Sequence, residues 1–124
     1  MSLVGRWRIV EMEHWAQEDV DLDGPGFIEF SRNHTGSFGF IAVEGVVGWR
    51  DVSRDGHHGV EFYLEGHDEG DQASGRGWAV RDDDGSLRGH IYFHPGDDSG
   101  FRAEPVDDGR PKPKDTLGAS RGRR

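Results

Sequence analysis

Three polar side chains that could perform acid–base chemistry alternate along one short stretch of the chain. His90, Tyr92 and His94 are separated by Ile91 and Phe93. In an extended strand successive side chains point to opposite faces, so the two imidazoles and the phenol would share one face. If that face lined a cavity, these groups could act as general acids and bases or hold a polar ligand by hydrogen bonds.

A second stretch repeats this design with carboxylates. Glu61, Tyr63 and Glu65 alternate with apolar residues in the same way. The same alternation is expected of any half-buried strand, whose apolar face lies on the core and whose polar face meets solvent. We favour this solvent-facing interpretation for both stretches and keep the cavity-lining one as the alternative. A barrel enzyme that uses the two histidines is therefore the weakest of the functions considered.

Two further clusters contain metal-ligand side chains. One is the His57-His58 pair, and the other is a mainly acidic run from His67 to Asp71. Imidazole and carboxylate groups suit zinc or non-haem iron. However, adjacent histidines in a turn cannot both face one side of a strand, and the acidic run lies in a very polar predicted loop, residues 66–74. We interpret that loop as solvated and predict no metal and no other cofactor.

Nucleophilic catalysis has little support in the sequence. The chain has no cysteine, which also excludes disulfides and thiolate metal sites. Ser74 and Ser99 lack the Gly-x-Ser-x-Gly context of a nucleophile elbow. The glycine-rich stretch at residues 75–78 is not followed by the Lys-Ser/Thr of a phosphate-binding loop. We therefore predict no catalytic residue.

The composition limits the fold that must position these side chains. The chain has 124 residues, the size of one domain, and its apolar content is low at 32%. It nevertheless contains 4 Trp and 7 Phe, and each large ring can bury roughly 150–250 Å². The 20 glycines argue against long helices, since glycine destabilises a helix interior. These features indicate a turn-rich, all-β protein.

The alternation predicts eight short strands separated by turns rich in Gly, Asp and Asn. They are expected at residues 3–12, 27–32, 37–43, 46–52, 59–65, 76–81, 87–94 and 100–106, with a tight hairpin turn at Glu44-Gly45. After the first connection no loop is long enough for a crossover helix, which favours an antiparallel meander. Eight such strands can close into an up-and-down β-barrel with room for one small ligand. A two-sheet sandwich is the alternative.

The charge divides the chain into two parts. Residues 1–106, the predicted barrel domain, carry a net charge of −12, whereas residues 107–124 carry +3. An acidic body repels phosphate backbones, so we predict no nucleic-acid partner. We interpret residues 107–124 as a disordered basic tail. No signal peptide or membrane span is apparent, and a soluble cytoplasmic protein without a membrane partner is expected.

The first and last predicted strands carry a family resemblance. Gly5-Arg6-Trp7 resembles the Gly-x-Trp motif of the calycin superfamily, which includes lipocalins and fatty-acid-binding proteins. In those families the Trp packs across the closed end of the barrel, and an arginine of the last strand lies against it. The resemblance implies that Gly5, Trp7 and Arg102 form a structural barrel floor and that a ligand enters at the other end. The likeness is closer to small bacterial proteins with calycin-like barrels and supplies no substrate.

Aromatic side chains either fill the barrel or, if it is hollow, form the wall of a ligand site. The candidate ligand-binding residues are Trp49, Phe62, Tyr63, Trp78, His90, Tyr92 and His94. The function we favour is non-catalytic binding of a small hydrophobic or amphipathic ligand. The alternative is an acidic protein-interaction module of the immunity or adaptor type. A homodimer is the oligomer considered beside the monomer.

Overall fold

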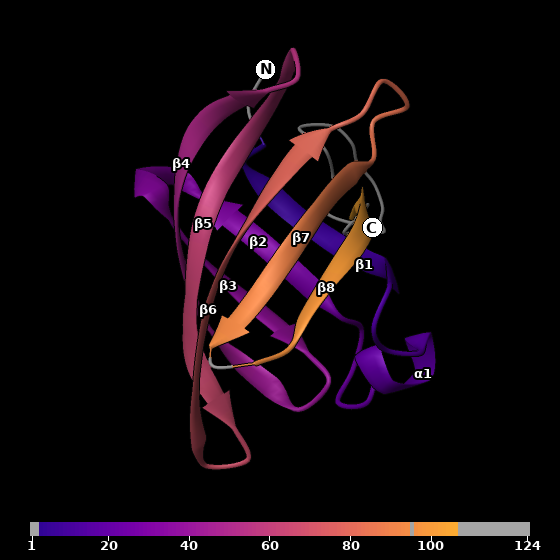
Figure 1. Ribbon diagram of the computed structural model, residues 1–124, viewed down its shortest axis with the longest axis vertical. Helices are drawn as coiled ribbons and strands as arrows, with labels where there is room; N and C mark the ends of the chain where they lie inside the picture. The colour runs from indigo at the N-terminus through magenta and orange to yellow at the C-terminus, as the bar shows by residue number, and fades with distance from the viewer. Residues whose placement is uncertain (1–2, 95, 107–124) are drawn as a thin grey trace, which may run out of the picture.

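The strands close into one antiparallel barrel in the computed structural model, which describes residues 3–94 and 96–106 (Figure 1). Each strand pairs with its neighbour in sequence, and β8 closes the barrel by pairing with β1. The strands are β1 (Gly5–Met12), β2 (Phe27–Ser31), β3 (Thr35–Phe40), β4 (Val43–Arg54), β5 (His57–Asp68), β6 (Asp71–Arg81), β7 (Leu87–His94) and β8 (Asp98–Pro105). A short helix, α1 (Gln17–Val20), joins β1 to β2, and a 3-10 turn, η1 (Arg32–His34), joins β2 to β3. The all-β, up-and-down barrel predicted from the alternation is confirmed, while the predicted tail at residues 107–124 lies outside the described residues.

The apolar faces of the strands line the barrel interior, as favoured from the sequence. On β7, Ile91 is fully buried, whereas its neighbour Tyr92 is 44% exposed. The polar face of this strand therefore points out of the barrel. The same holds for β5, where Phe62 is buried and Tyr63 is 63% exposed.

Aromatic rings fill the interior because one strand makes room for them. The inner face of β6 carries only glycine and alanine between its ends, including Gly75 and Gly77. A Cβ atom on Gly77 would lie 2.8 Å from the Phe62 ring. Phe30 in turn contacts Phe62 and Trp49, with ring centroids 5.8 and 6.0 Å apart. Within the described part of the chain the interior is thus a packed core.

The β5–β6 connection differs from its prediction as a long polar loop. β5 and β6 stay paired as far as Asp68 and Asp71, and only Glu69-Gly70 forms the turn. Both turn residues have positive φ, 52° and 95°, as a two-residue type I′ hairpin requires. The polar composition was misleading, because a hairpin arm that extends beyond the barrel meets water on both faces and shows no apolar alternation.

The turn between β3 and β4 is also displaced from its predicted position. Gly45 lies within β4, where a Cβ atom would approach the carbonyl oxygen of Glu65 to 2.0 Å. The chain turns instead at Ile41-Ala42, with Ile41 at a φ of 59°. The Ile41 N–H donates to the carbonyl of Val20 at 2.8 Å. A tertiary hydrogen bond to the end of α1 thus helps to hold a turn that no glycine marks.

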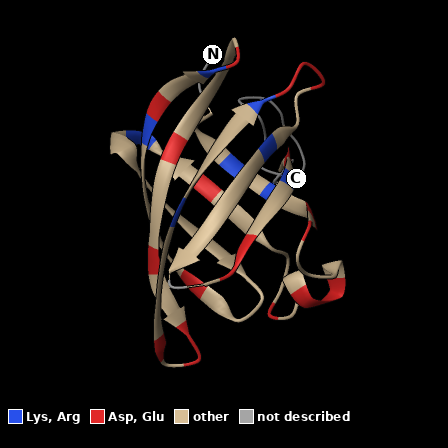
Figure 2. Ribbon diagram, in the orientation of Figure 1, with Lys and Arg blue, Asp and Glu red and all other residues tan. Residues whose placement is uncertain are grey.

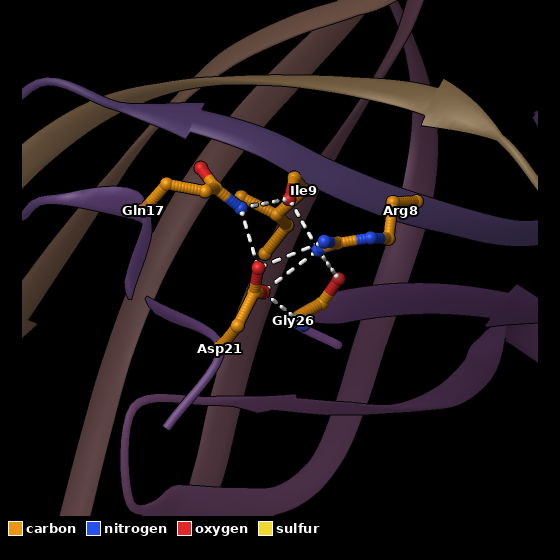
Figure 3. Close-up of polar contacts among 5 residues, drawn as sticks. All are labelled: Arg8, Ile9, Gln17, Asp21 and Gly26. Carbon is orange, nitrogen blue, oxygen red and sulfur yellow. Dashed lines mark hydrogen bonds and ion pairs between the residues drawn. The ribbon is translucent and has the colours of Figure 1, made fainter. Parts of the chain in front are cut away.

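The segment that contains α1 is tied to β1 by a network around Arg8 and Asp21 (Figure 3). The Arg8 guanidinium donates two hydrogen bonds of 2.8 Å to the Asp21 carboxylate, one to each oxygen. Asp21 also accepts from the Gly26 N–H at 2.8 Å and from the Gln17 amide at 3.1 Å. Chiefly through the Arg8 hydrogen bonds, the network lowers the pKa of Asp21 to about 2. This network fixes the first connection against the barrel wall.

The expected barrel floor is built with a different arginine. Trp7 is buried and its indole N–H donates to the carbonyl of Leu3 at 3.0 Å. The Arg102 side chain instead lies on the outer face of β8, between Glu11 and Glu104 at 3.7 and 3.6 Å. The predicted stacking of Arg102 on Trp7 is therefore wrong, because its neighbours in the strand take the inward positions.

Arg81 takes the place that was expected of Arg102. Its guanidinium carbon lies 5.9 Å from the centre of the Trp7 ring. Arg81 is the last residue of β6 and shares the inner face of that strand with Ala79. A cation–π contact at the end of the barrel is thus present, but it comes from the sixth strand.

Candidate functional site

A groove of about 800 Å³ runs over the outer face of β4 to β7, and we call it the outer groove. It is open to solvent and combines aromatic rings with arginine side chains. Its lining residues are His34, Gly48, Trp49, Arg50, Arg54, Glu61, Phe62, Tyr63, Arg76, Gly77, Trp78 and Tyr92.

The register of the sheet brings the centre of the outer groove together. Tyr63 on β5 pairs with Arg76 on β6, and Arg76 pairs with Tyr92 on β7. Directly opposed residues on one face have Cβ atoms about 4.5–5.5 Å apart. One arginine therefore stands between two exposed tyrosines, although the three residues lie far apart in the sequence.

Gly48 allows the Tyr63 ring to lie over β4. The two residues are directly opposed in the β4–β5 pair. A Cβ atom on Gly48 would lie 2.4 Å from the Cζ atom of Tyr63, so the ring occupies the space that a side chain would need. The phenol ring therefore leans away from Arg76 and forms part of the floor of the outer groove.

Arg76 has no ion-pair or hydrogen-bond partner among the described residues. Its two cross-strand neighbours are tyrosines, which cannot neutralise it. Arg50, in the same groove, is different because it donates to the directly opposed Glu61 at 2.6 Å. Arg76 is thus a free cation between aromatic side chains, as an anion-binding residue would be.

Arg54 supplies a further positive charge at the edge of the outer groove. Its guanidinium carbon lies 4.0 Å above the centre of the Trp78 ring. A guanidinium that stacks on an indole keeps its N–H groups free at the rim of the plane, where they can donate to an anion. The groove therefore presents three arginines and one glutamate.

The groove differs in charge from the rest of the molecule. Figure 2 shows acidic residues gathered on α1 and at the β5–β6 and β6–β7 turns, at the ends of the barrel. The chain as a whole has a net charge of −9. A locally basic groove on an acidic protein favours a small anion and disfavours a long polyanion, which would also meet the acidic ends.

Five of the seven predicted ligand-binding residues line the outer groove, but in two different ways. Tyr63, Trp78 and Tyr92 belong to its outer surface. Trp49 and Phe62 border it while their side chains are buried on the core side of the sheet. Trp49 is held there because its indole N–H donates to the carbonyls of β2 and β3 at 3.0 and 2.8 Å.

The two predicted histidines lie outside the outer groove. His90 stacks on Tyr92, with ring centroids 4.5 Å apart, and its Nε2 lies 2.5 Å from a carboxylate oxygen of Asp98. His94 borders an adjoining hollow of about 460 Å³ together with Glu65 and other residues. The structure therefore does not bring the two imidazoles and the phenol of β7 into one enclosed site.

The arginines of the outer groove were not among the sequence candidates. The signal that could have found Arg76 is its position opposite Tyr63 and Tyr92, but this needs the strand register. The two clusters of metal-ligand side chains, for which no metal site was predicted, lie at opposite ends of β5. Within residues 3–94 and 96–106, no group of three or more His, Asp or Glu side chains lies close enough to hold a metal ion.

The fold and the groove define a class: an eight-stranded up-and-down β-barrel with a packed interior and an open, arginine- and tyrosine-lined groove on its outer face. No protein-family model, curated protein or solved structure matches this chain. No helix in the described part of the chain is long and apolar enough to cross a membrane.

Proposed function

We propose that the protein binds a small amphipathic anion, without catalysis, in the outer groove. The ligand carries an aromatic ring and a carboxylate or phosphate group. The single observation that carries this proposal is Arg76, a cation without a partner in the described chain, set between Tyr63 and Tyr92. Binding of a small ligand thus remains the proposal, but the ligand lies on the outer face of the barrel and not in its interior.

The aromatic part of the ligand is argued from the exposed rings. Tyr63 and Tyr92 are 63% and 44% exposed, so each ring offers exposed surface to a planar group, although His90 lies against the Tyr92 ring. Rings that stack in offset or edge-to-face geometry gain about 0.5–1.5 kcal/mol beyond their buried area. Arg54 already covers one face of Trp78, so that face is not available to the ligand.

The anionic part is argued from the arginines. A guanidinium donates two parallel hydrogen bonds to a carboxylate or phosphate, and hydrogen bonds to charged groups contribute about 1.5–3 kcal/mol. Glu61 neutralises Arg50, which leaves Arg76 and Arg54 to bind the anion. Loss of Arg76 should therefore weaken binding by a factor of about 10–100.

The test is titration calorimetry of the full chain with indole-3-propionate, which has one aromatic ring system and one carboxylate. We expect Arg76→Gln to weaken binding at least about tenfold. The control is Arg6→Gln, because Arg6 is likewise an arginine on a strand but lies on β1, outside the outer groove, where it pairs with Glu29 at 2.8 Å. Its substitution should leave the affinity unchanged.

A neutral probe separates the two parts of the ligand. We expect 3-methylindole, which lacks the carboxylate, to bind more weakly than indole-3-propionate and to be insensitive to Arg76→Gln. Backbone amide shifts in NMR spectra should move on β5, β6 and β7. Absence of binding, or equal binding by Arg76→Gln and Arg6→Gln, would overturn the proposal.

A further inference from the structure

A second hollow, of about 460 Å³, adjoins the outer groove on the same face of the barrel. The two share Tyr63, Arg76 and Tyr92, so Arg76 stands on the boundary between them. This space, which we call the second hollow, is also lined by Glu65, Ser74 and His94, among other residues. One ligand anchored on Arg76 can therefore reach into both spaces.

Glu65 is an unneutralised carboxylate in the second hollow. Its directly opposed neighbours are Val46 on β4 and Ser74 on β6, and neither carries a charge. Among the described residues it has no ion-pair or hydrogen-bond partner. It thus differs from Glu61, two residues earlier on the same face, which binds Arg50.

Glu65 and Arg76 are close neighbours that do not bind each other. Arg76 lies two residues beyond Ser74, the residue opposite Glu65, which makes the pair diagonal neighbours across β5 and β6. Diagonal neighbours have Cα atoms about 7–8 Å apart. A free carboxylate and a free guanidinium at this spacing are complementary to a molecule that carries both charges.

We propose that the ligand is a zwitterion of the aromatic amino acid class, an inference that rests on the proposed function. Its carboxylate binds Arg76 and its aromatic side chain lies in the outer groove. Its ammonium group lies in the second hollow against Glu65. In an α-amino acid the carboxylate, the ammonium group and the side chain are all attached to one carbon atom. A carboxylate bound at Arg76 would therefore place the other two groups in the two hollows that meet at this residue.

Three probes with the same indole ring test this assignment by titration calorimetry of the full chain. L-tryptophan carries both charges, indole-3-propionate only the carboxylate, and tryptamine only the ammonium. We expect L-tryptophan to bind at least about tenfold more tightly than either single-charge probe. Glu65→Gln should remove this advantage by weakening the binding of L-tryptophan, and it should strengthen the binding of indole-3-propionate slightly, because a negative charge near the ligand carboxylate is lost.

The matched control is Glu104→Gln, which removes an exposed carboxylate from the outer face of β8 and should leave all three affinities unchanged. If indole-3-propionate binds through Arg76 but L-tryptophan binds no more tightly, the zwitterion assignment is wrong and the proposed function stands. The assignment is also wrong if Glu65→Gln leaves the tryptophan affinity unchanged. If none of the three probes binds, the assignment and the proposed function both fail.

Discussion

Replacement of Asp21 by Asn should lower the stability of the barrel in a way that depends on pH. Asp21 holds the connection between β1 and β2 through the two hydrogen bonds from Arg8 and the one from the Gly26 N–H. Asn has nearly the same shape but no charge. Its NH₂ group would also meet a donor where the carboxylate oxygen now accepts.

The expected loss follows from the pKa of Asp21. The network lowers this pKa from 3.8 to about 2. Since one pKa unit corresponds to about 1.4 kcal/mol, the ceiling is about 2.5 kcal/mol. The side chains of Asp21 and Arg8 are 26% and 34% exposed, so solvent screens the pair. We therefore expect the unfolding free energy to fall by about 1–2 kcal/mol near pH 7.

The direction of the pH dependence is fixed by the lowered pKa. Above about 3.8 the carboxylate is ionised in both the folded and the unfolded chain, and the full stabilisation is present. As the pH falls from 3.8 through about 2, the unfolded chain takes up a proton before the folded chain, and the stabilisation is lost. The difference between wild type and Asp21→Asn should therefore shrink over this window.

Urea denaturation followed by tryptophan fluorescence, from neutral pH down to about pH 2, measures this difference. The matched control is Asp19→Asn, since Asp19 lies on the same short helix and is exposed. No side-chain interaction of Asp19 occurs within the described residues. The reasoning is refuted if the Asp21→Asn deficit is the same at all pH values, or if Asp19→Asn causes an equal deficit.

Four other predictions concern the packing of the barrel, its outer groove and its turns. Gly66→Ala should unfold the barrel or cost about 3 kcal/mol or more in urea denaturation, since its Cβ would lie 2.0 Å from a backbone oxygen of β4. Gly48→Ala should cost much less stability, because the nearest atoms to its Cβ belong to the outer end of the Tyr63 ring, which can rotate away, and it should alter binding of indole-3-propionate; equal stability losses at both glycines would contradict this. Phe62→Ala should lower the unfolding free energy by about 3–5 kcal/mol, and a loss below about 1 kcal/mol would show that the interior is not packed. Glu69→Asn should raise the melting temperature, because Asn tolerates the positive φ of this turn better, and a decrease would argue against a type I′ turn.

The candidate site could be predicted only in part. Tyr63, Trp78 and Tyr92 were candidates for the wall of a hollow barrel, whereas the structure places them on its outer face, in the outer groove. Arg76 was missed because an arginine in a strand is unremarkable until its cross-strand neighbours are known. Glu65 likewise has no ion-pair partner among the described residues because the residues directly opposite it, Val46 and Ser74, are uncharged. These two residues lie far from each other in the chain, so the sequence alone does not show that they flank Glu65.

The sequence by itself determined the number and kind of elements. Period-two alternation and turn residues are local signals, because a strand buried on one face must repeat every two residues. They were sufficient for eight strands, for the up-and-down order and for the outward direction of Tyr92. They failed where an arm meets water on both faces, as at the β5–β6 hairpin.

Only the tertiary structure decided which residues meet across the barrel. Strand register placed Arg81, rather than Arg102, over Trp7, and it set Arg76 between two tyrosines. A shift of one residue in any strand would exchange its two faces, so the site depends on contacts between strands that no local pattern encodes. Packing of the apolar faces in the core fixes the register of the strands, and the register determines which side chains are neighbours on the outer face.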